Sequence, residues 1–430
     1  MDNVVIEKFG GASINSASAV RNVITILQRP TDRKRVIVVS AMGKTTNALE
    51  KVVNMWHKNK RFNYEEFERI KEYHRGIAEE LFNQNTLESV LKQLNDIFEQ
   101  IEERIKTLNP LDYNFLYDNI VSYGERLSST IVSLYMDYVH MKHRLVEAQN
   151  YIKTDNTFRA AQVDWKQTRK SIDKDFNYLF DESDLILTQG FIGSTREGYT
   201  TTLGREGSDY SAAIFAYCLD ADSLTIWKDV NGLMNADPKR MENTVKLNIV
   251  PYKEAIELSY YGASIIHPKT IKPLENKSIP LYVRSFNNPE LQGSIICHGE
   301  QVVPLVPNYI FKEKQTLLSV STKDFSFIAE DNISNIFSIL SKHGVKVNLI
   351  QNSALTFSVC FEHSEFVLQN LIEDLQQFYN VKYNNDLQLI TIRHYTEDSI
   401  KEATRNSKIL IEQKNRVTIQ CLIKPETESA

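Results

Sequence analysis

Residues 4–13, VVIEKFGGAS, place a short apolar run directly before two glycines. The run at 4–6 predicts a strand, and apolar side chains at positions 20, 23, 24 and 27 predict one face of a following helix. Two glycines between a strand and a helix let the backbone approach a ligand closely, and a helix N-terminus favours an anion. Taken alone, the junction is equally compatible with a plain tight turn.

Strands and helices continue to alternate along the chain. Residues 35–40, RVIVVS, are apolar without alternation, as expected for a strand buried on both faces. Further β-like runs occur at 185–187, 224–226 and 281–283, with helical segments between most of them. This order predicts an α/β sandwich around a mostly parallel sheet, in a first domain expected at 1–298.

Residues from about 50 to 150 are rich in Glu, Lys, Asn and Leu and almost free of glycine. Apolar positions between 87 and 105 mark one long helical stripe, with Asn85 and Glu88 expected to form its capping box. We expect a helical insertion at about 55–150, with a packing role favoured over that of a moving lid.

Glycines and prolines interrupt the chain near residues 295–315, where we expect a domain boundary. Two βαββαβ-like patterns follow it, the first expected at 312–384 and a second, reduced one at 385–425. Such small domains commonly bind ligands or pair with copies of themselves.

The composition argues against several classes of partner. With 50 basic and 55 acidic residues the net charge is −5, which gives no electrostatic reason to expect nucleic acid or an anionic membrane surface. Strand-like sequence begins at Asn3, which leaves no room for a signal peptide, and no run approaches roughly 18 apolar residues. The four cysteines form no CxxC and suit free thiols in a reducing cytosol, so we expect a cytoplasmic protein.

Two further glycine-bearing segments follow predicted strands. Residues 40–47, SAMGKTTN, contain GKT, but a P-loop needs glycine where Val38 stands, so a small-residue turn is predicted instead. Residues 203–209, LGREGSD, follow QGFIG and place Arg205 and Asp209 four apart. Arg205 suits a carboxylate and Asp209 could accept from an amine or orient Lys8; a structural Arg–Asp pair that caps a helix is the alternative.

Residues 227–239, WKDVNGLMNADPK, contain two turns with two acids and two lysines. This composition suits a nucleotide and its phosphates, although a solvated loop would have similar polarity. HRD, DFG, GxSxG and HExxH motifs are absent from the sequence, which excludes a protein-kinase design, a nucleophile elbow and a zincin site.

Seven motifs, taken together and in order, resemble aspartate kinase along residues 1 to about 295. They are KFGGAS, VVSAMGKTTN, YGERLS, QGFIG, LGREGSD, DVNGLMNADP and YGASIIHP. The C-terminal units resemble the paired ACT domains that close many members of this family. The resemblance implies the amino-acid-kinase fold, a three-layer α/β/α sandwich, followed by two ferredoxin-like α+β ACT units.

The resemblance also implies a reaction: the γ-phosphoryl of MgATP moves to the β-carboxylate of L-aspartate, giving 4-phospho-L-aspartate. This product feeds lysine, threonine, methionine and often diaminopimelate synthesis. A carboxylate nucleophile is already ionised at neutral pH, so positioning and charge neutralisation carry the catalysis. ATP and Mg²⁺ are implied without a dedicated metal ligand, as are a homodimer through the ACT units and a possible amino-acid effector. A single-function enzyme is expected, because the chain ends at Ala430.

Roles follow from the resemblance by position. Lys8 would stabilise the transferring phosphoryl group, and Asp209 would orient Lys8 or the substrate amine. Thr45, Glu125 and Arg205 would hold aspartate, with Glu125 pairing its α-amine and Arg205 a carboxylate. The residues expected along ATP are Gly10, Gly11, Ser40, Ala41, Lys228, Asp229, Met234, Asp237 and Lys239.

The chain departs from the family pattern at several positions. The family motif GAKxxHP is GASIIHP here, so Ser264 replaces a lysine expected near the phosphates, and Lys269 or Lys228 could compensate. Glu206 adds a negative charge beside Arg205. At three positions expected along the nucleotide, the family often has threonine where Lys228 stands, tyrosine where Met234 stands and arginine where Lys239 stands.

The chain also departs from the family pattern at positions expected to bind a regulatory amino acid. The acidic positions of lysine-sensitive members are Asn348 and Ala354 here, so we hypothesise weak or no inhibition by lysine. Two alternatives to an aspartate kinase stay open: a kinase of the same fold acting on another small molecule, such as glutamate, N-acetylglutamate or a nucleotide, and a catalytically silent amino-acid-binding regulator.

Overall fold

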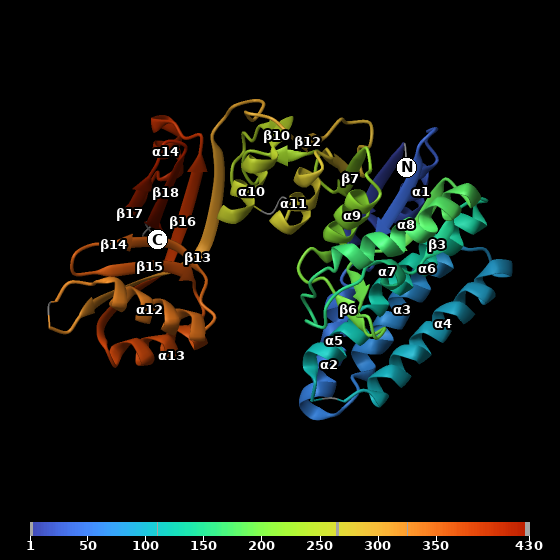
Figure 1. The fold of residues 1–430 in the computed structure, drawn as a ribbon, viewed down its shortest axis with the longest axis horizontal. Coiled ribbons are helices and arrows are strands. Elements are labelled where there is room, and N and C mark those ends of the chain that lie inside the picture. Colours follow the sequence, from blue (N-terminus) through green and yellow to red (C-terminus); the bar gives the residue numbers. More distant parts are fainter. Residues whose placement is uncertain (1–2, 110, 264–265, 325, 426–430) are drawn as a thin grey trace. The chain divides into compact units, whose positions relative to one another are not determined.

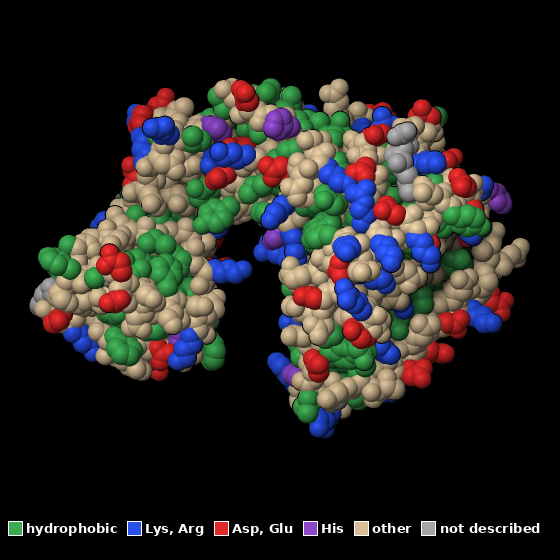
Figure 2. Space-filling view, viewed as in Figure 1, with side chains coloured by type: hydrophobic (Ala, Val, Ile, Leu, Met, Phe, Trp, Pro, Cys, Tyr) green, Lys and Arg blue, Asp and Glu red, His purple; other side chains and the backbone are tan. Residues whose placement is uncertain are grey.

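The computed structural model describes residues 3–109, 111–263, 266–324 and 326–425 (Figure 1). The chain forms two compact units: the first comprises residues 1–233, 246–256 and 265–303, and the second 234–245, 257–264 and 304–430. Lys and Arg side chains are interspersed with Asp and Glu on the face seen in Figure 2. None of the helices in the described ranges is both long and apolar enough to cross a bilayer.

An eight-stranded sheet forms the centre of the first unit, in the order β10-β12-β11-β7-β1-β2-β4-β3. Neighbouring strands are parallel except β11 and β12. The strands are β1 (Val4–Phe9), β2 (Lys34–Val39), β3 (Arg144–Val146), β4 (Leu185–Gln189), β7 (Ser223–Lys228), β10 (Ile249–Pro251), β11 (Leu281–Ser285) and β12 (Ser294–Cys297). Each apolar run picked out in the sequence coincides with one of them, although β2 ends at Val39, one residue before the predicted run does, and central parallel strands are buried on both faces.

Helices cover both faces of the sheet. One face carries α1 (Ala17–Leu27) and α6 (Tyr123–Tyr138), and the other α8 (Trp165–Glu182), α9 (Gly207–Cys218) and α11 (Pro268–Asn276). Phe9, Ile37 and Leu187 share an apolar core with α1 and α6. Side chains alternate along a strand, so Lys8 points to the opposite face, toward α9. The predicted three-layer α/β/α sandwich is confirmed.

The segment between β2 and β3 is helical, as expected for the insertion. Its helices are α2 (Thr45–Asn59), α3 (Tyr64–Leu81), α4 (Gln84–Thr107), α5 (Tyr113–Val121) and α6. The stripe of α4 is buried in the same core as α1. The capping prediction was wrong by two residues: Asn83 caps α4 by accepting the Thr86 N–H at 3.1 Å. Both asparagines sit in one polar run, and only the turn geometry selects between them.

Shorter elements complete the chain up to residue 297. They are η1 (Gly11–Ile14), α7 (Ala148–Tyr151), β5 (Ile192–Ser194), β6 (Thr200–Thr202), β8 (Leu233–Met234), β9 (Lys246–Leu247) and α10 (Tyr252–Tyr261). The hairpin of β5 and β6 follows β4 and leads directly into α9.

The second unit is built on one antiparallel sheet in the order β14-β15-β13-β16-β18-β17. Its elements are β13 (Asn308–Thr322), α12 (Glu330–Lys342), β14 (Val347–Asn352), β15 (Phe357–Glu362), α13 (Glu365–Gln376), β16 (Tyr379–Arg393), α14 (Glu397–Ala403), β17 (Ser407–Lys414) and β18 (Thr418–Pro425). The two ferredoxin-like patterns expected from the sequence are confirmed as a fold. They share the long central strands β13 and β16, and the boundaries at 384 and 385 stay a prediction.

Candidate active site

A cleft forms where β7, β1, β2 and β4 end side by side. Parallel strands present their carboxyl ends at one edge of the sheet, which is where α/β folds bind ligands. The cleft has a volume of about 420 Å³. It is lined by Lys8, Gly11, Ser40, Ala41, Gly43, Thr46, Tyr117, Glu125, Arg159, Phe191, Gly204, Arg205, Glu206, Gly207, Ser208 and Asp209.

A buried ion pair lies at the centre of this cleft. Lys8 Nζ is 2.5 Å from Asp209 Oδ1, and both residues are less than a tenth exposed. Lys228 Nζ, at the end of β7, is 3.9 Å from Asp209 Oδ2. Burial opposes ionisation of Asp209, yet Lys8 and Lys228 together hold its pKa below the ordinary value. The predicted pairing of Asp209 with Lys8 therefore has the geometry it requires.

The turns after β1 and β2 pack backbone against backbone. A side chain at Gly11 would place its Cβ 2.7 Å from the Ala41 carbonyl oxygen and 2.9 Å from that of Gly43. The Gly43 N–H donates to the Gly11 carbonyl at 3.1 Å. Only glycine at position 11 allows this approach, so the GG pair is more than a tight turn: it brings the turn after β2 to the cleft.

Glu125 supplies a buried carboxylate from the first turn of α6. It is 2% exposed, and its Oε1 accepts the Ala41 N–H at 3.3 Å. Its Oε2 has no hydrogen-bond partner in the described part of the chain. Burial raises the pKa of Glu125 to about 8, and nearby Lys8 opposes this rise only in part. An unsatisfied buried carboxyl of this kind is suited to a cationic group of a ligand.

Arg205 and Glu206 lie where β6 leads into α9. Arg205 is exposed and lines the cleft, and no described residue forms an ion pair with it. Glu206 has φ 52° at the start of α9, and its Oε2 accepts the backbone N–H of His267 at 2.9 Å. The extra negative charge expected beside Arg205 is thus engaged with the segment before α11.

Thr45 is placed differently from the other predicted aspartate ligands. It is 3% exposed and absent from the cleft lining, where Thr46 is found instead. Its Oγ1 donates to the Met42 carbonyl at 2.7 Å and lies 3.5 Å from Nε2 of the buried His74. Its assignment to aspartate stays a prediction.

The predicted nucleotide residues fall into groups. Gly11, Ser40 and Ala41 line the cleft, Gly10 lies beside Lys8, and Asp229 is exposed at the end of β7. Met234, Asp237 and Lys239 belong to the second compact unit, and their assignment to ATP stays a prediction.

Ser264, the substitution in the GAKxxHP-like motif, lies outside the described residues. Of the two lysines considered as substitutes, Lys269 donates to the Leu203 carbonyl at 3.1 Å and lies over the Tyr210 ring. Lys228 is the one that approaches Asp209.

Two lining residues, Tyr117 and Arg159, were not anticipated from the sequence. The Arg159 guanidinium lies 4.5 Å from the Tyr117 ring centroid. Neither residue belongs to a recognisable motif, and the helix carrying Tyr117 reaches the cleft only through tertiary packing. The φ of Arg159, +70°, would have been a signal, but it is a property of the folded chain.

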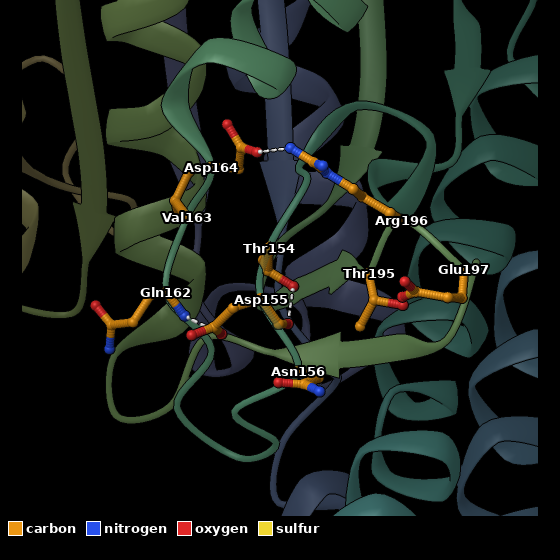
Figure 3. A pocket seen from close by; sticks show the side chains of 9 residues that line it. All are labelled: Thr154, Asp155, Asn156, Gln162, Val163, Asp164, Thr195, Arg196 and Glu197. Atoms are coloured by element: carbon orange, nitrogen blue, oxygen red, sulfur yellow. Dashed lines mark hydrogen bonds and ion pairs between the residues drawn. The ribbon is translucent and has the colours of Figure 1, made fainter.

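A second pocket of about 420 Å³ lies elsewhere in the first unit (Figure 3). Several of its polar groups are engaged with one another: Asp155 accepts the Gln162 N–H at 2.9 Å, and Arg196 lies 3.3 Å from Asp164, the cap of α8. The described residues hold no group of three or more His, Cys, Asp or Glu side chains placed to bind a metal ion.

Comparison with known families identifies the class. The sequence pattern of the Amino acid kinase family matches residues 3–285, which is most of the chain. The chain belongs to the amino acid kinase family.

Aspartokinases are among the curated proteins that this chain resembles. Lysine-sensitive aspartokinase 3 of Escherichia coli (strain K12) is 28% identical over 404 residues, covering 91% of this chain and 87% of the relative. Aspartokinase 1, chloroplastic, of Arabidopsis thaliana is 30% identical over 379 residues, 86% of this chain and 65% of the relative. Against the bifunctional aspartokinase/homoserine dehydrogenase 2 of the same plant, 27% identical over 380 residues, 86% of this chain spans only 41% of the relative.

Solved structures agree on the fold. The E. coli aspartokinase III complex with lysine and aspartate has a TM-score of 0.82 at 23% identity, covering 99% of this chain and 97% of that one. Clostridium acetobutylicum aspartate kinase has a TM-score of 0.77 at 22% identity, covering 98% and 96%. These similarities confirm the fold class expected from the sequence.

Proposed function

We propose that this chain is an aspartate kinase, which transfers the γ-phosphoryl of MgATP to the β-carboxylate of L-aspartate. The product is 4-phospho-L-aspartate, and the reaction opens the aspartate-derived route to lysine, threonine, methionine and diaminopimelate. The proposal rests on the cleft together with the aspartokinase relatives.

The observation that carries the proposal is the unsatisfied Oε2 of Glu125 in a cleft that also holds Lys8 and Arg205. L-Aspartate offers one ammonium and two carboxylates. Glu125 suits the ammonium, Arg205 suits a carboxylate through its paired N–H groups, and Lys8 suits the phosphoryl group. A neutral or purely anionic acceptor would leave Glu125 without a partner.

The chemistry asks little of the protein. A β-carboxylate oxygen attacks the γ-phosphorus, the bond from that phosphorus to the β–γ bridging oxygen breaks, and ADP leaves with the electron pair. No proton has to be removed from the acceptor, so catalysis is positioning and charge neutralisation. Lys8 Nζ lies 2.5 Å from Asp209 and is a fixed positive charge that stabilises the equatorial oxygens of the phosphoryl group in the transition state.

The phosphates would lie against the backbone of the turns after β1 and β2, at Gly10, Gly11, Ser40 and Ala41. The N-terminus of α9 adds the positive end of its helix dipole. Lys228 is the better candidate for the charge that the family motif places at position 264, because Lys269 is engaged with a backbone carbonyl. Mg²⁺ enters with ATP as part of the substrate.

The test is a trapping assay. Purified protein is incubated with MgATP, L-aspartate and hydroxylamine, which converts an acyl phosphate into a hydroxamate. We expect a signal that requires aspartate and is lost in Lys8→Ala. A folded wild-type protein that gives no hydroxamate with aspartate, but does with glutamate or N-acetylglutamate, would reassign the acceptor. No signal with any carboxylate would favour the silent regulator.

Weak or absent inhibition by lysine remains part of the proposal. Asn348, where lysine-sensitive relatives are expected to be acidic, has both side-chain ends engaged: its Oδ1 accepts from Lys312 Nζ at 2.8 Å and its Nδ2 donates to Gln315 at 2.8 Å. Micromolar binding of lysine in calorimetry would contradict this part of the proposal. A homodimer through the second unit is likewise proposed, and its mass in solution tests it.

A further inference from the structure

Arg159 is a cleft residue that no sequence motif marks, and it shares a positive φ with two other non-glycine lining residues, Phe191 and Glu206. It follows α7 in the loop that precedes α8, and its φ is +70°, in the region that favours glycine. Residues held in such conformations cluster at functional sites, because the surrounding structure must enforce them.

A buried carboxylate enforces this conformation. Asp118 of α5 is 0% exposed, and its two oxygens accept the Arg159 N–H at 3.1 and 2.9 Å. The same carboxylate accepts the Thr202 N–H at 2.9 Å and the Thr202 hydroxyl at 2.6 Å. Asp118 therefore ties the Arg159 loop to β6, the strand that leads to Arg205, and fixes both arginines relative to α5.

The side chain of Arg159 is held on one wall of the cleft. Its guanidinium lies 4.5 Å from the Tyr117 ring centroid and 5.1 Å from that of Tyr113, both on α5. Its ion pair with Glu50 is 3.4 Å long and involves only Nη2. A guanidinium carries five N–H donors in a planar fork, so most of its donors are left for a ligand.

The charges of the cleft leave room for an anion at this wall. Lys8 is paired with Asp209, and Glu206 accepts the His267 N–H. Glu125, with a pKa raised to about 8 by burial, is largely protonated near neutral pH before a ligand arrives. Arg205 has no ion pair with a described residue, and Arg159 meets Glu50 only through Nη2 at 3.4 Å, so the other guanidinium donors of both arginines are available to a ligand.

We propose that Arg159 is a substrate-binding residue that, with Arg205, holds the α-carboxylate of the acceptor amino acid. This rests on the proposed function. The reacting β-carboxylate must face Lys8 on β1, whereas the α-carboxylate shares its carbon with the ammonium assigned to Glu125. Glu125 lies in the first turn of α6, which directly follows α5. Tyr117 of α5 lines the cleft and its ring packs against the Arg159 guanidinium, so the non-reacting end of the acceptor meets Arg159.

The test compares two acceptors in the hydroxamate assay. L-Aspartate has the α-carboxylate, and L-aspartic acid α-amide keeps the ammonium and the β-carboxylate but replaces the α-carboxylate by a neutral amide. In Arg159→Gly we expect KM for aspartate to rise roughly 10- to 100-fold, KM for the α-amide to change less than threefold, and kcat for both to stay within a few fold.

Glycine is the informative replacement because a φ of +70° suits it, so loss of the fold is not expected to obscure the result. Arg159→Lys should recover only part of the preference, since an ammonium cannot form the paired contact. Arg196→Gly, an exposed arginine of the second pocket, is the matched control and should leave both KM values unchanged.

The outcomes separate the two proposals. If wild-type protein makes no hydroxamate from aspartate, the proposed function fails. If wild-type is active and Arg159→Gly keeps the wild-type ratio of the two KM values, the role of Arg159 is overturned, including the case where both KM values rise together through a loop displacement.

Discussion

Two pockets of the first compact unit, each of about 420 Å³, differ in how their polar groups are satisfied. In the pocket of Figure 3, Asp155 and Asp164 accept backbone N–H groups and Arg196 reaches Asp164. In the cleft of Lys8, a buried Glu125 oxygen has no partner among the described residues, and Arg205 has no ion pair there. The two pockets have the same volume; the cleft differs in its unsatisfied buried polar group, which makes it the candidate binding site.

The largest effect should come from Lys8→Ala. Removing the fixed charge at the transferring phosphoryl group should lower kcat by roughly 10²–10³-fold or more, measured as hydroxamate formed per enzyme at saturating aspartate and MgATP. It also leaves Asp209 buried without its closest cation, so circular dichroism must show an intact fold. A variant that keeps more than a tenth of wild-type kcat would contradict the assignment.

Glu125→Gln should be next in size. We expect KM for aspartate to rise by about 10²-fold, because a charge-assisted pair with the ammonium is lost, while Glu197→Gln in the second pocket changes it less than twofold. In wild-type protein kcat/KM should increase with pH until about 8, the pKa to which burial raises Glu125. This ionisation should vanish from the profile of the variant.

Glu125→Gln, which should weaken aspartate binding, should make the folded protein more stable at high pH. The pKa of Glu125 is raised from 4.5 to about 8, so the folded state binds the proton more tightly and the wild-type free energy of unfolding falls as pH rises through that window. At pH 8.5 Glu125→Gln should therefore be the more stable protein, by on the order of 1–3 kcal/mol, in urea unfolding. If the wild-type protein has the same free energy of unfolding at pH 5 and pH 8.5, burial does not raise the pKa of Glu125 as proposed.

Asp118→Asn should destabilise the folded protein. An amide puts an N–H group where Asp118 now accepts from Arg159 and Thr202, leaving buried donors unsatisfied at a cost on the order of 1–3 kcal/mol. Burial raises the pKa of Asp118 from 3.8 to about 6, so the free energy of unfolding of the wild-type protein should fall as the pH rises from about 4 to about 6. This decrease should be absent in the variant.

Asp155→Asn in the second pocket is the matched comparison. Although burial works against it, hydrogen bonds from Gln162 and Thr157 lower the pKa of Asp155, so its contribution is present above the ordinary value of 3.8 and is lost as pH falls. The two aspartates should thus give pH dependences of opposite sign. Slopes of the same sign would contradict the contrast between Asp118, which positions the cleft residue Arg159, and Asp155 of the second pocket.

The smallest effect should come from Arg196→Ala. Its ion pair with Asp164 is 3.3 Å long and its side chain is 73% exposed, so we expect a loss of about 0–1 kcal/mol. Hydroxamate formation should remain within twofold of wild-type. A large loss of activity would mean that the second pocket takes part in the reaction and would break the comparison.

Much of the fold was predictable because its signals are local. The apolar runs at 35–40 and 185–187 are strands, and the two C-terminal ferredoxin-like patterns are present. The cap of α4 was misplaced, since Asn83 and Asn85 are chemically equivalent and only the turn selects one. Residues 234–245 and 257–264 belong to the second compact unit, which no local pattern reveals.

The sequence by itself determined the α/β class, the glycine turns after β1 and β2, and the candidates Lys8, Arg205 and Asp209, because their motifs are contiguous and each follows or begins a regular element. Glu125 became a candidate only through the resemblance of its motif YGERLS to aspartate kinase. Only the tertiary structure decided that Glu125 is buried with an oxygen unsatisfied, that Thr45 turns away from the cleft lining, and that Arg159 joins it. Burial, hydrogen-bond satisfaction and a positive φ depend on segments far apart in the chain, and so they exist only once the chain has folded.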